Sequence, residues 1–302
     1  MGVASVDLSV QIGSMRLKNP IITASGTFGY NDEYSDFMDL QGIGAIITKG
    51  ITLRPRSGNP QPRIKEVKGG LINSIGLENV GIQAFIEKKL PVLREKNIEF
   101  IVNIAGESIE EYKELARICH NNGIGAIELN LSCPNVDKGC LEFGKDEATL
   151  SRLVSGVREA FSGTLIVKLG SNVSFPEKIA LTVQNAGADA ISAINTVKAM
   201  NITLNENHKG FKFIKGGLSG PCIKPIALNF IWEIRKVVSI PIIGMGGIAS
   251  LTDMLEFFAV GANVIQIGTG TFMSPNISER LAHELRDFMM ISGYNSLQDL
   301  IS

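Results

Sequence analysis

Short apolar runs alternate with amphipathic helical patterns along nearly the whole chain, and this alternation constrains the fold more than any other feature. Compact apolar runs bounded by turn residues are typical of parallel strands that are covered on both faces. Helical patterns lie between most of the runs, for example at 82–94, 108–120, 151–161 and 225–238. The eight runs span residues 20–25, 45–49, 100–103, 126–130, 165–168, 190–195, 240–244 and 264–268. The order predicts an α/β fold with a parallel sheet.

One local pattern recurs four times and places a glycine between the end of a helix and the start of a strand. The copies begin at Gly42, Gly123, Ala186 and Val260, and in each we expect the glycine to adopt the left-handed conformation that ends a helix. The copies precede every second run of the series. Small residues are common at such places in any α/β fold, but the alternation favours a closed (β/α)8 TIM barrel over an open doubly wound sheet. We expect residues 1–302 to form a single barrel domain.

Two segments do not fit a bare barrel. Residues 51–75 contain the proline-rich stretch Arg54–Arg63, and residues 197–220 are rich in Asn, Lys and Gly. Both follow predicted strands, so they would lie at the C-terminal face, where barrel enzymes build their active sites. We therefore expect insertions that cap this face.

Composition and charge exclude several classes of protein. The 29 Lys and Arg residues balance 30 Asp and Glu residues, and a net charge of −1 gives no global attraction to nucleic acid or to an anionic membrane. No apolar run suits a membrane span, and the first residues do not resemble a signal peptide. The four cysteines (Cys119, Cys133, Cys140 and Cys222) show no metal-ligand spacing. We expect a cytoplasmic protein with no metal site or iron–sulfur cluster of its own.

The ends of the predicted strands are unusually polar, and a barrel enzyme gathers its catalytic groups from several such positions. Lys168 ends the fifth run, where a cation could lie near the N1–C2=O edge of a flavin and stabilise the charge of the reduced ring. Asn103 and Asn130 offer donors and acceptors that suit the pyrimidine edge of a flavin. The glycine-rich loops 244–250 and 268–270 predict a site for a phosphate group, which backbone N–H groups would bind.

The most distinctive stretch follows the fourth run and spans Asn130–Gly144. It places Cys133 between Ser132 and Pro134, in a glycine-containing loop that could close as a lid. A free cysteine alone is more often a small buried hydrophobic residue than a base. The surrounding pattern is therefore what makes Cys133 a candidate.

Several stretches resemble the dihydroorotate dehydrogenase family, and in particular the catalytic subunit of its NAD-linked class 1B. They are Ala24–Gly29, Thr48–Gly50 with Pro55–Arg63, Asn73–Leu77, Asn130–Gly144 and Gly244–Gly247. They occur in the expected order, and the resemblance extends from about residue 7 to residue 295. It implies an FMN-binding (β/α)8 barrel that oxidises (S)-dihydroorotate to orotate in pyrimidine (UMP) biosynthesis.

The resemblance also implies roles for single residues. Cys133 would be the base that takes a proton from C5 of dihydroorotate while a hydride passes from C6 to FMN, and Lys49 would pair with the substrate carboxylate. Asn135 would be a further contact. The residues implied to bind FMN are Ser25, Lys49, Gly50, Asn103, Asn130, Lys168, Ile194, Gly220, Gly246, Gly247, Gly268 and Thr269. The residues implied to bind the substrate are Lys49, Asn73, Ser74, Ile75, Gly76, Leu77, Asn130, Asn195 and Thr196.

The chain has neither the glycine fingerprint of a dinucleotide-binding domain nor cysteines spaced for a cluster. The resemblance implies that electrons leave FMN through a partner subunit with FAD and a [2Fe–2S] cluster, in a heterotetramer built on a homodimer of this chain. Cys140 departs from the family pattern, which usually has glycine there, and adds a second thiol to the predicted lid.

Other functions stay open at this point. A dihydropyrimidine (dihydrouracil) dehydrogenase module would act on a substrate without the carboxylate that Lys49 would bind. A fumarate-linked class 1 enzyme would be a homodimer that needs no partner, although the 139–144 and 55–63 segments argue against it. A phosphate-binding lyase or isomerase, or a mere flavin-binding partner, would lack the redox step.

Overall fold

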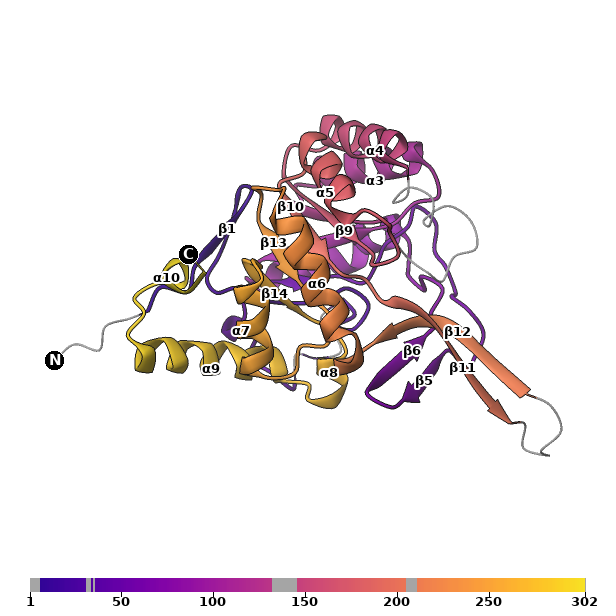
Figure 1. Ribbon diagram of the computed structural model, residues 1–302. Coiled ribbons are helices and arrows are strands. Elements are labelled where there is room, and N and C mark those ends of the chain that lie inside the picture. The colour runs from indigo at the N-terminus through magenta and orange to yellow at the C-terminus, as the bar shows by residue number, and fades with distance from the viewer. Residues whose placement is uncertain (1–5, 31–33, 35, 132–145, 205–210, 302) are drawn as a thin grey trace.

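The computed structural model describes residues 6–30, 34, 36–131, 146–204 and 211–301. Eight parallel strands form its centre in the order β3-β14-β13-β10-β9-β8-β7-β4, and a parallel bridge between Ile22 and Ala45 closes the ring. The strands are β3 (Ile21–Thr23), β4 (Ile46–Ile47), β7 (Phe100–Ile104), β8 (Ala126–Asn130), β9 (Thr164–Leu169), β10 (Ala190–Ala193), β13 (Ile242–Gly244) and β14 (Val264–Ile267). Each predicted run contributes one strand, so the (β/α)8 TIM barrel is confirmed (Figure 1).

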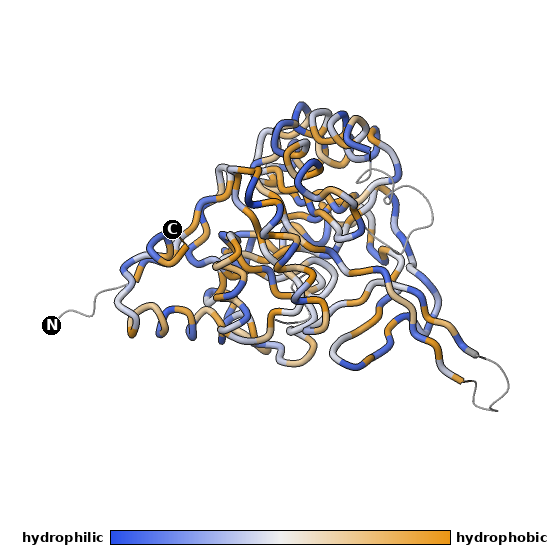
Figure 2. The backbone as a smooth tube through the Cα atoms, in the orientation of Figure 1, coloured by the Kyte–Doolittle hydropathy of each residue, from blue (hydrophilic) through white to orange (hydrophobic). Residues whose placement is uncertain are grey.

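Helices surround the barrel and turn an apolar face toward it. In α3, Ser108 caps the helix by accepting a hydrogen bond from the Glu111 N–H, and Tyr112, Leu115 and Cys119 bury one face. The resulting alternation of hydrophobic and hydrophilic residues is visible along the helices in Figure 2. The helices are α1 (Ile82–Ala84), α2 (Leu90–Glu95), α3 (Ile109–Asn121), α4 (Glu147–Ala160), α5 (Pro176–Asn185), α6 (Lys224–Arg235), α7 (Leu251–Ala259), α8 (Gly270–Met273), α9 (Ile277–Ser292) and α10 (Leu297–Ile301), with short 3₁₀ turns η1 (Leu40–Gly42) and η3 (Pro221–Ile223).

Three of the predicted helices differ in detail from the structure. The helix predicted at 225–238 is α6, which ends at Arg235, three residues before the predicted end. The segment predicted at 151–161 belongs to α4, which begins four residues earlier because the Asp146 carboxylate accepts a hydrogen bond from the Thr149 N–H at 2.9 Å. The segment predicted at 82–94 is divided, since the π-helical turn η2 (Phe85–Lys89) separates α1 from α2.

The glycine repeat behaves as predicted in three copies and differently in the first. Gly123, Gly187 and Gly261 have φ angles of 64°, 100° and 101°, which is the left-handed region that favours glycine. Gly42 has no positive φ and instead ends the 3₁₀ turn η1. A Cβ atom at Gly42 would lie 2.9 Å from Cγ of Glu279 on α9, so a side chain at this position would force the Glu279 side chain to shift.

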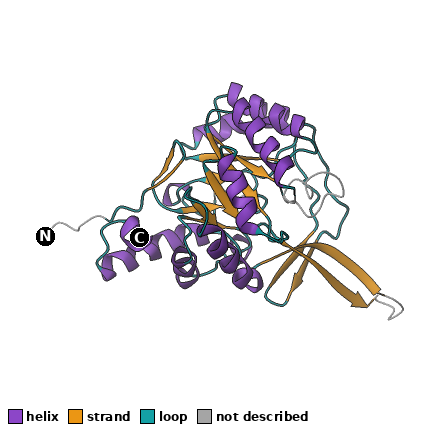
Figure 3. Cartoon of the chain, turned by 45° about the horizontal axis from the view of Figure 1, so that its top comes forward, coloured by secondary structure: helices purple, strands orange, loops and turns teal. Residues whose placement is uncertain are grey.

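The two insertions pair with each other in a four-stranded antiparallel sheet outside the barrel. Its order is β11-β12-β6-β5, and the pairing of β6 with β12 joins the two insertions. The strands are β5 (Ile64–Val67), β6 (Gly70–Asn73), β11 (Val197–Leu204) and β12 (Phe211–Ser219). The β11–β12 hairpin projects away from the barrel (Figure 1), and Figure 3 shows the sheet below the helical layer from a second side. The predicted cap is therefore a sheet.

A hairpin that the sequence patterns did not predict closes the other end of the barrel. It consists of β1 (Val10–Ile12) and β2 (Met15–Leu17). Ile12, Met15 and Leu17 are buried in one cluster with Ala126, Ala190 and Val264, which are the first residues of three barrel strands. The turn is anchored as well, because the Ser14 N–H donates to Oγ1 of Thr164 at 3.1 Å.

Candidate functional site

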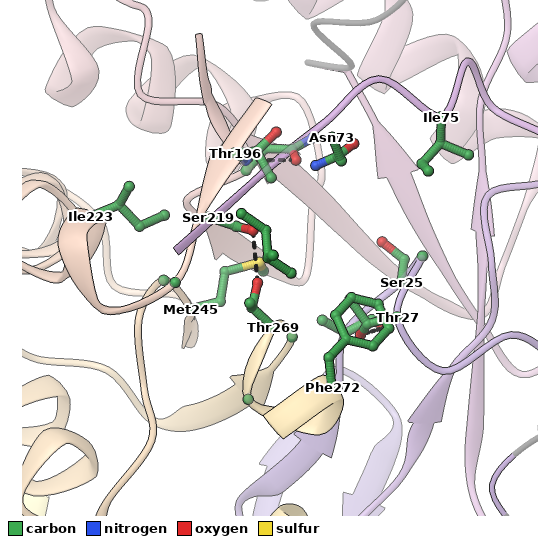
Figure 4. A pocket seen from close by; sticks show the side chains of 18 of the residues that line it. Ser25, Thr27, Asn73, Ile75, Thr196, Ser219, Ile223, Met245, Thr269 and Phe272 are labelled. Atoms are coloured by element: carbon green, nitrogen blue, oxygen red, sulfur yellow. Dashed lines mark hydrogen bonds between the residues drawn. The ribbon is translucent and has the colours of Figure 1, made fainter. Parts of the chain in front are cut away.

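A cavity of about 500 Å³ lies at the C-terminal ends of the barrel strands, between the barrel and the inserted sheet. Figure 4 shows side chains from both parts around it. Asn73 and Thr196 lie together on one side, while Ser25 and Thr27 lie near Phe272 on another. The predicted site residues that line the cavity are Ser25, Lys49, Gly50, Asn73, Ile75, Gly76, Leu77, Asn130, Lys168, Ile194, Asn195, Thr196, Gly220, Gly246, Gly247, Gly268 and Thr269.

Two predicted site residues do not line this cavity. Asn103 is fully buried below it, and its Oδ1 atom is the nearest neighbour, at 2.9 Å, of a Cβ atom placed on Gly50. Ser74 faces Asn59, whose Nδ2 donates to the Ser74 carbonyl and hydroxyl at 3.0 Å each. Cys133 lies outside the described residues, together with Asn135 and Cys140.

The glycine loops bring backbone unusually close to the cavity. Gly220, Gly246 and Gly247 have φ angles of 106°, 126° and 84°. A Cβ atom at Gly247 would lie 2.8 Å from the Gly220 carbonyl oxygen, and one at Gly220 would lie 2.7 Å from Cα of Gly70. Only glycine allows both the conformation and the contact, and it leaves room for a ligand to approach the backbone.

An ion-pair cluster supports the loop before α7. Lys224 Nζ lies 2.5 Å from Oδ1 of Asp253 and 2.7 Å from Oε2 of Glu256, and these bonds raise the pKa of Lys224. Burial disfavours ionisation of Asp253, but hydrogen bonds from Lys224, the Ala249 N–H and Ser250 outweigh it and lower the pKa of Asp253. Ser250 and Asp253 also form a capping box at the start of α7.

Two amides connect the ends of β8 and β10 at the cavity, on either side of β9. Asn195 Nδ2 donates to Oδ1 of Asn130 at 3.2 Å, and the Tyr112 hydroxyl donates to the Asn130 carbonyl at 2.8 Å. Lys49 also lines the cavity, and its ammonium has no hydrogen bond or ion pair with the described part of the chain. The site therefore offers a free cation beside oriented amides, which suits a small anion with ring amides.

A buried polar layer lies below the cavity, and sequence reasoning missed its centre. Glu128 is fully buried on β8, with Asn103, Lys168, Ser192 and Gln266 around its carboxylate. The sequence did contain a signal that Glu128 belongs to the site. Glu128 precedes Asn130 by two residues, and alternate residues of a strand share a face.

Three further features bear on the chemistry. Burial raises the pKa of the Cys119 thiol to about 12, so this cysteine cannot act as a base near neutral pH. No helix among the described residues is long and apolar enough to span a membrane. The described residues also contain no group of three His, Cys, Asp or Glu side chains placed to hold a metal ion.

The sequence is similar to a known family and to curated proteins over nearly its whole length. The family profile described as dihydroorotate dehydrogenase matches residues 7–289. The protein named "Dihydroorotate dehydrogenase B (NAD(+)), catalytic subunit" from Geotalea daltonii is 47% identical over 300 residues, which cover 99% of this chain and 98% of that protein. Proteins with this name from Geobacter metallireducens and Trichlorobacter lovleyi are 47% and 46% identical, with at least 97% of both chains covered.

Proposed function

Because this chain belongs to the dihydroorotate dehydrogenase family, we propose that it is the catalytic subunit of an NAD-linked enzyme that oxidises (S)-dihydroorotate to orotate in pyrimidine biosynthesis. The observation that carries the proposal is the composition of the cavity, which combines two lysines, three asparagines and glycine loops at one end of a barrel. A phosphate-bearing planar cofactor and a small anionic substrate both suit such a site.

The residues present fit FMN. A Cβ atom on Gly220 or Gly247 would collide with neighbouring loop backbone, so these glycines let the loops pack closely together at the cavity wall, where backbone N–H groups could bind a phosphate. Gln266 Oε1 and Asn103 Oδ1 are buried without a hydrogen-bond partner among the described residues, and Gln266 lines the cavity. Buried acceptors are costly unless they are paired, so a ligand N–H at the cavity floor would stabilise this arrangement. FMN, when bound, accepts the two electrons that the substrate loses.

We assign the cofactor contacts as the family resemblance implies them. Gly246, Gly247, Gly268 and Thr269 would bind the phosphate through the loops after β13 and β14. Lys168 would place its positive charge beside the isoalloxazine ring. Asn103 would act from below, because it is buried beneath the cavity rather than on its wall.

The substrate contacts follow from the free lysine and the amides. Lys49 would pair with the carboxylate of dihydroorotate, and Asn130, Asn195 and Asn73 would bond the ring amides and orient the reacting carbon atoms. An analogue without the carboxylate would leave Lys49 unpaired in the cavity, which disfavours dihydrouracil. Cys133, as the proton acceptor, is proposed on the family resemblance alone.

The partner is also part of the proposal. The word "subunit" in the relatives' names supports a second chain, and we assign FAD and a [2Fe–2S] cluster to it. A heterotetramer built on a homodimer of this chain in the cytoplasm completes the proposal.

Purified chain tests the function directly. We expect a yellow protein that releases FMN on denaturation, that reduces an artificial dye with dihydroorotate, and that acts poorly on dihydrouracil. We expect poor use of NAD until a partner subunit is added. A colourless protein that FMN does not restore would contradict the redox function, and rapid NAD reduction without a partner would contradict the two-subunit arrangement.

A further inference from the structure

Glu128 is a buried acid to which the chemistry proposed above gives no role. It lies on β8 two residues before Asn130, and none of its surface is exposed. Since alternate residues of a strand share a face, Glu128 points into the barrel directly below Asn130, which lines the cavity. Ionisable side chains are almost never fully buried unless they are paired.

Four side chains surround the Glu128 carboxylate. Asn103 Nδ2 donates to Oε1 at 2.6 Å, and Ser192 Oγ donates to Oε2 at 2.7 Å. Gln266 Nε2 lies 3.4 Å from Oε2, and Lys168 Nζ lies 3.7 Å from Oε1. Both Lys168 and Gln266 line the cavity, so the carboxylate is one side chain away from a bound ligand.

We propose that Glu128 sets the reduction potential of the bound flavin, because its buried negative charge opposes Lys168 and keeps this potential low. The inference rests on the proposed function, since it requires FMN in the cavity. Reduction adds negative charge to the flavin, which Lys168 stabilises and Glu128 destabilises. Water screens buried charges weakly, so a carboxylate 3.7 Å from the ammonium offsets much of its field.

A low potential suits a flavin that must pass its electrons onward to NAD. An unopposed Lys168 would hold electrons on the flavin and slow their transfer to the partner. The donors from Asn103 and Ser192 satisfy the lone pairs of the carboxylate and make its burial tolerable, but they do not remove its charge. Glu128 is thus a positioning residue whose effect on the flavin passes through Lys168.

The test is a spectroscopic redox titration of the FMN-loaded chain with two substitutions that separate charge from shape. Glu128→Gln keeps the shape and removes the charge, and we expect it to favour reduced flavin at least about tenfold, which is about 30 mV upward for a two-electron couple. Glu128→Asp keeps the charge and shortens the side chain, and we expect a potential close to that of the unaltered chain. If Glu128 acted through packing alone, Glu128→Asp would shift the potential more than Glu128→Gln.

Two further variants complete the design. Ser192→Ala keeps the carboxylate but removes one donor, so we expect a smaller, downward shift; this variant decides the matter if Glu128→Gln does not retain FMN. Thr164→Val removes the contacts of a buried threonine at the opposite end of the barrel. It should lower stability and leave the potential unchanged, which separates a loss of stability from an electrostatic effect.

The outcomes distinguish this inference from the proposed function. An upward shift in Glu128→Gln that Glu128→Asp does not share supports it. An unmoved or lowered potential in Glu128→Gln, or equal shifts in both variants, overturns it even though FMN is bound and reduced by dihydroorotate. Where Ser192→Ala decides, an unchanged or raised potential overturns it. Failure of the unaltered chain to bind FMN or to react with dihydroorotate would instead contradict the function.

Discussion

Lys168 Nζ donates a hydrogen bond to Ser25 Oγ at 3.1 Å, and this contact crosses the barrel. Ser25 follows β3 and Lys168 lies on β9, two strands that are four places apart in the ring of eight. Lys168 is only 4% exposed. A long, flexible side chain is thereby held in one place at the cavity, which is the condition for preorganised charge stabilisation.

We expect Lys168→Met to slow flavin reduction by dihydroorotate about 10²-fold, the loss found when one preorganised donor is removed. FMN binding should change far less, because the cation matters most when the flavin gains negative charge. Stopped-flow single turnovers and FMN titration of the same preparation measure the two effects. Lys236→Met, on the outer part of the barrel where Lys236 pairs with Glu233, is the control. Normal reduction rates in Lys168→Met would mean that Lys168 is a rim residue without a role in the reaction.

Gly247 and Gly293 offer a matched pair for the phosphate loop. Their φ angles are similar, at 84° and 77°, but a Cβ atom on Gly247 would meet the Gly220 carbonyl at 2.8 Å, whereas nothing lies within 4 Å of one on Gly293. We expect both alanine variants to lose about 1–2 kcal/mol of unfolding free energy from the left-handed backbone, and Gly247→Ala to lose more because of its contact with the Gly220 carbonyl. Only Gly247→Ala should also weaken FMN binding. The dissociation constant should rise about tenfold for each 1.4 kcal/mol of binding free energy that the shifted loop loses. Calorimetric FMN titration of both variants decides, and equal affinities would contradict the phosphate assignment.

The lowered pKa of Asp253 should make the stability of the folded chain depend on pH. Its folded-state pKa is lowered, so its contribution is present above the ordinary carboxyl pKa of about 3.9 and is lost as the pH falls through the lower folded value. Asp253→Asn should therefore destabilise the chain at pH 7, by about 1–3 kcal/mol for a partly buried charged hydrogen bond. The difference from the unaltered chain should shrink below about pH 3.9. Urea unfolding at both pH values measures this, and a difference that grows in acid would show that the carboxylate is not stabilising when ionised.

Local patterns predicted the barrel because each strand carries its own signal. The run at 264–268 and the left-handed glycine at Gly261 are both visible within a few residues of sequence. The β1–β2 hairpin has strands of three residues, too short for a periodic pattern, and its burial depends on the first residues of distant strands. The left-handed conformation predicted for Gly42 was wrong. Its neighbour Glu279 comes from the far end of the chain, so local sequence could not reveal this contact.

In the candidate site, too, local signals were predictable from the sequence and contacts between distant residues were not. Strand ends and glycine loops predicted part of the cavity wall, since a barrel brings all such positions to one rim, and the family resemblance added residues such as Asn73 and Gly220. The environment of Glu128 could not be predicted from neighbours, because its partners lie 25 to 138 residues away in sequence. The inserted sheet likewise depends on pairing between residues 144 positions apart, such as Asn73 and Gly217.

Cys133 provides the last prediction. Replacing it with serine should leave the fold and FMN binding intact, because the two side chains are nearly isosteric. Turnover should fall about 10²–10⁴-fold near neutral pH, since a serine hydroxyl is a far weaker acid than a thiol and the sequence places no His or Asp beside it. Some activity should return at higher pH, where hydroxide replaces the missing base. Single-turnover flavin reduction across pH measures both effects.

Cys140→Ser is the matched control, because Cys140 lies seven residues further along the sequence and matches no catalytic position of the family. It should keep near-normal rates at every pH. Cys119 cannot replace the missing thiol, since burial raises its pKa to about 12. If Cys133→Ser reacted at the normal rate and Cys140→Ser did not, the proton acceptor would be Cys140 and not Cys133.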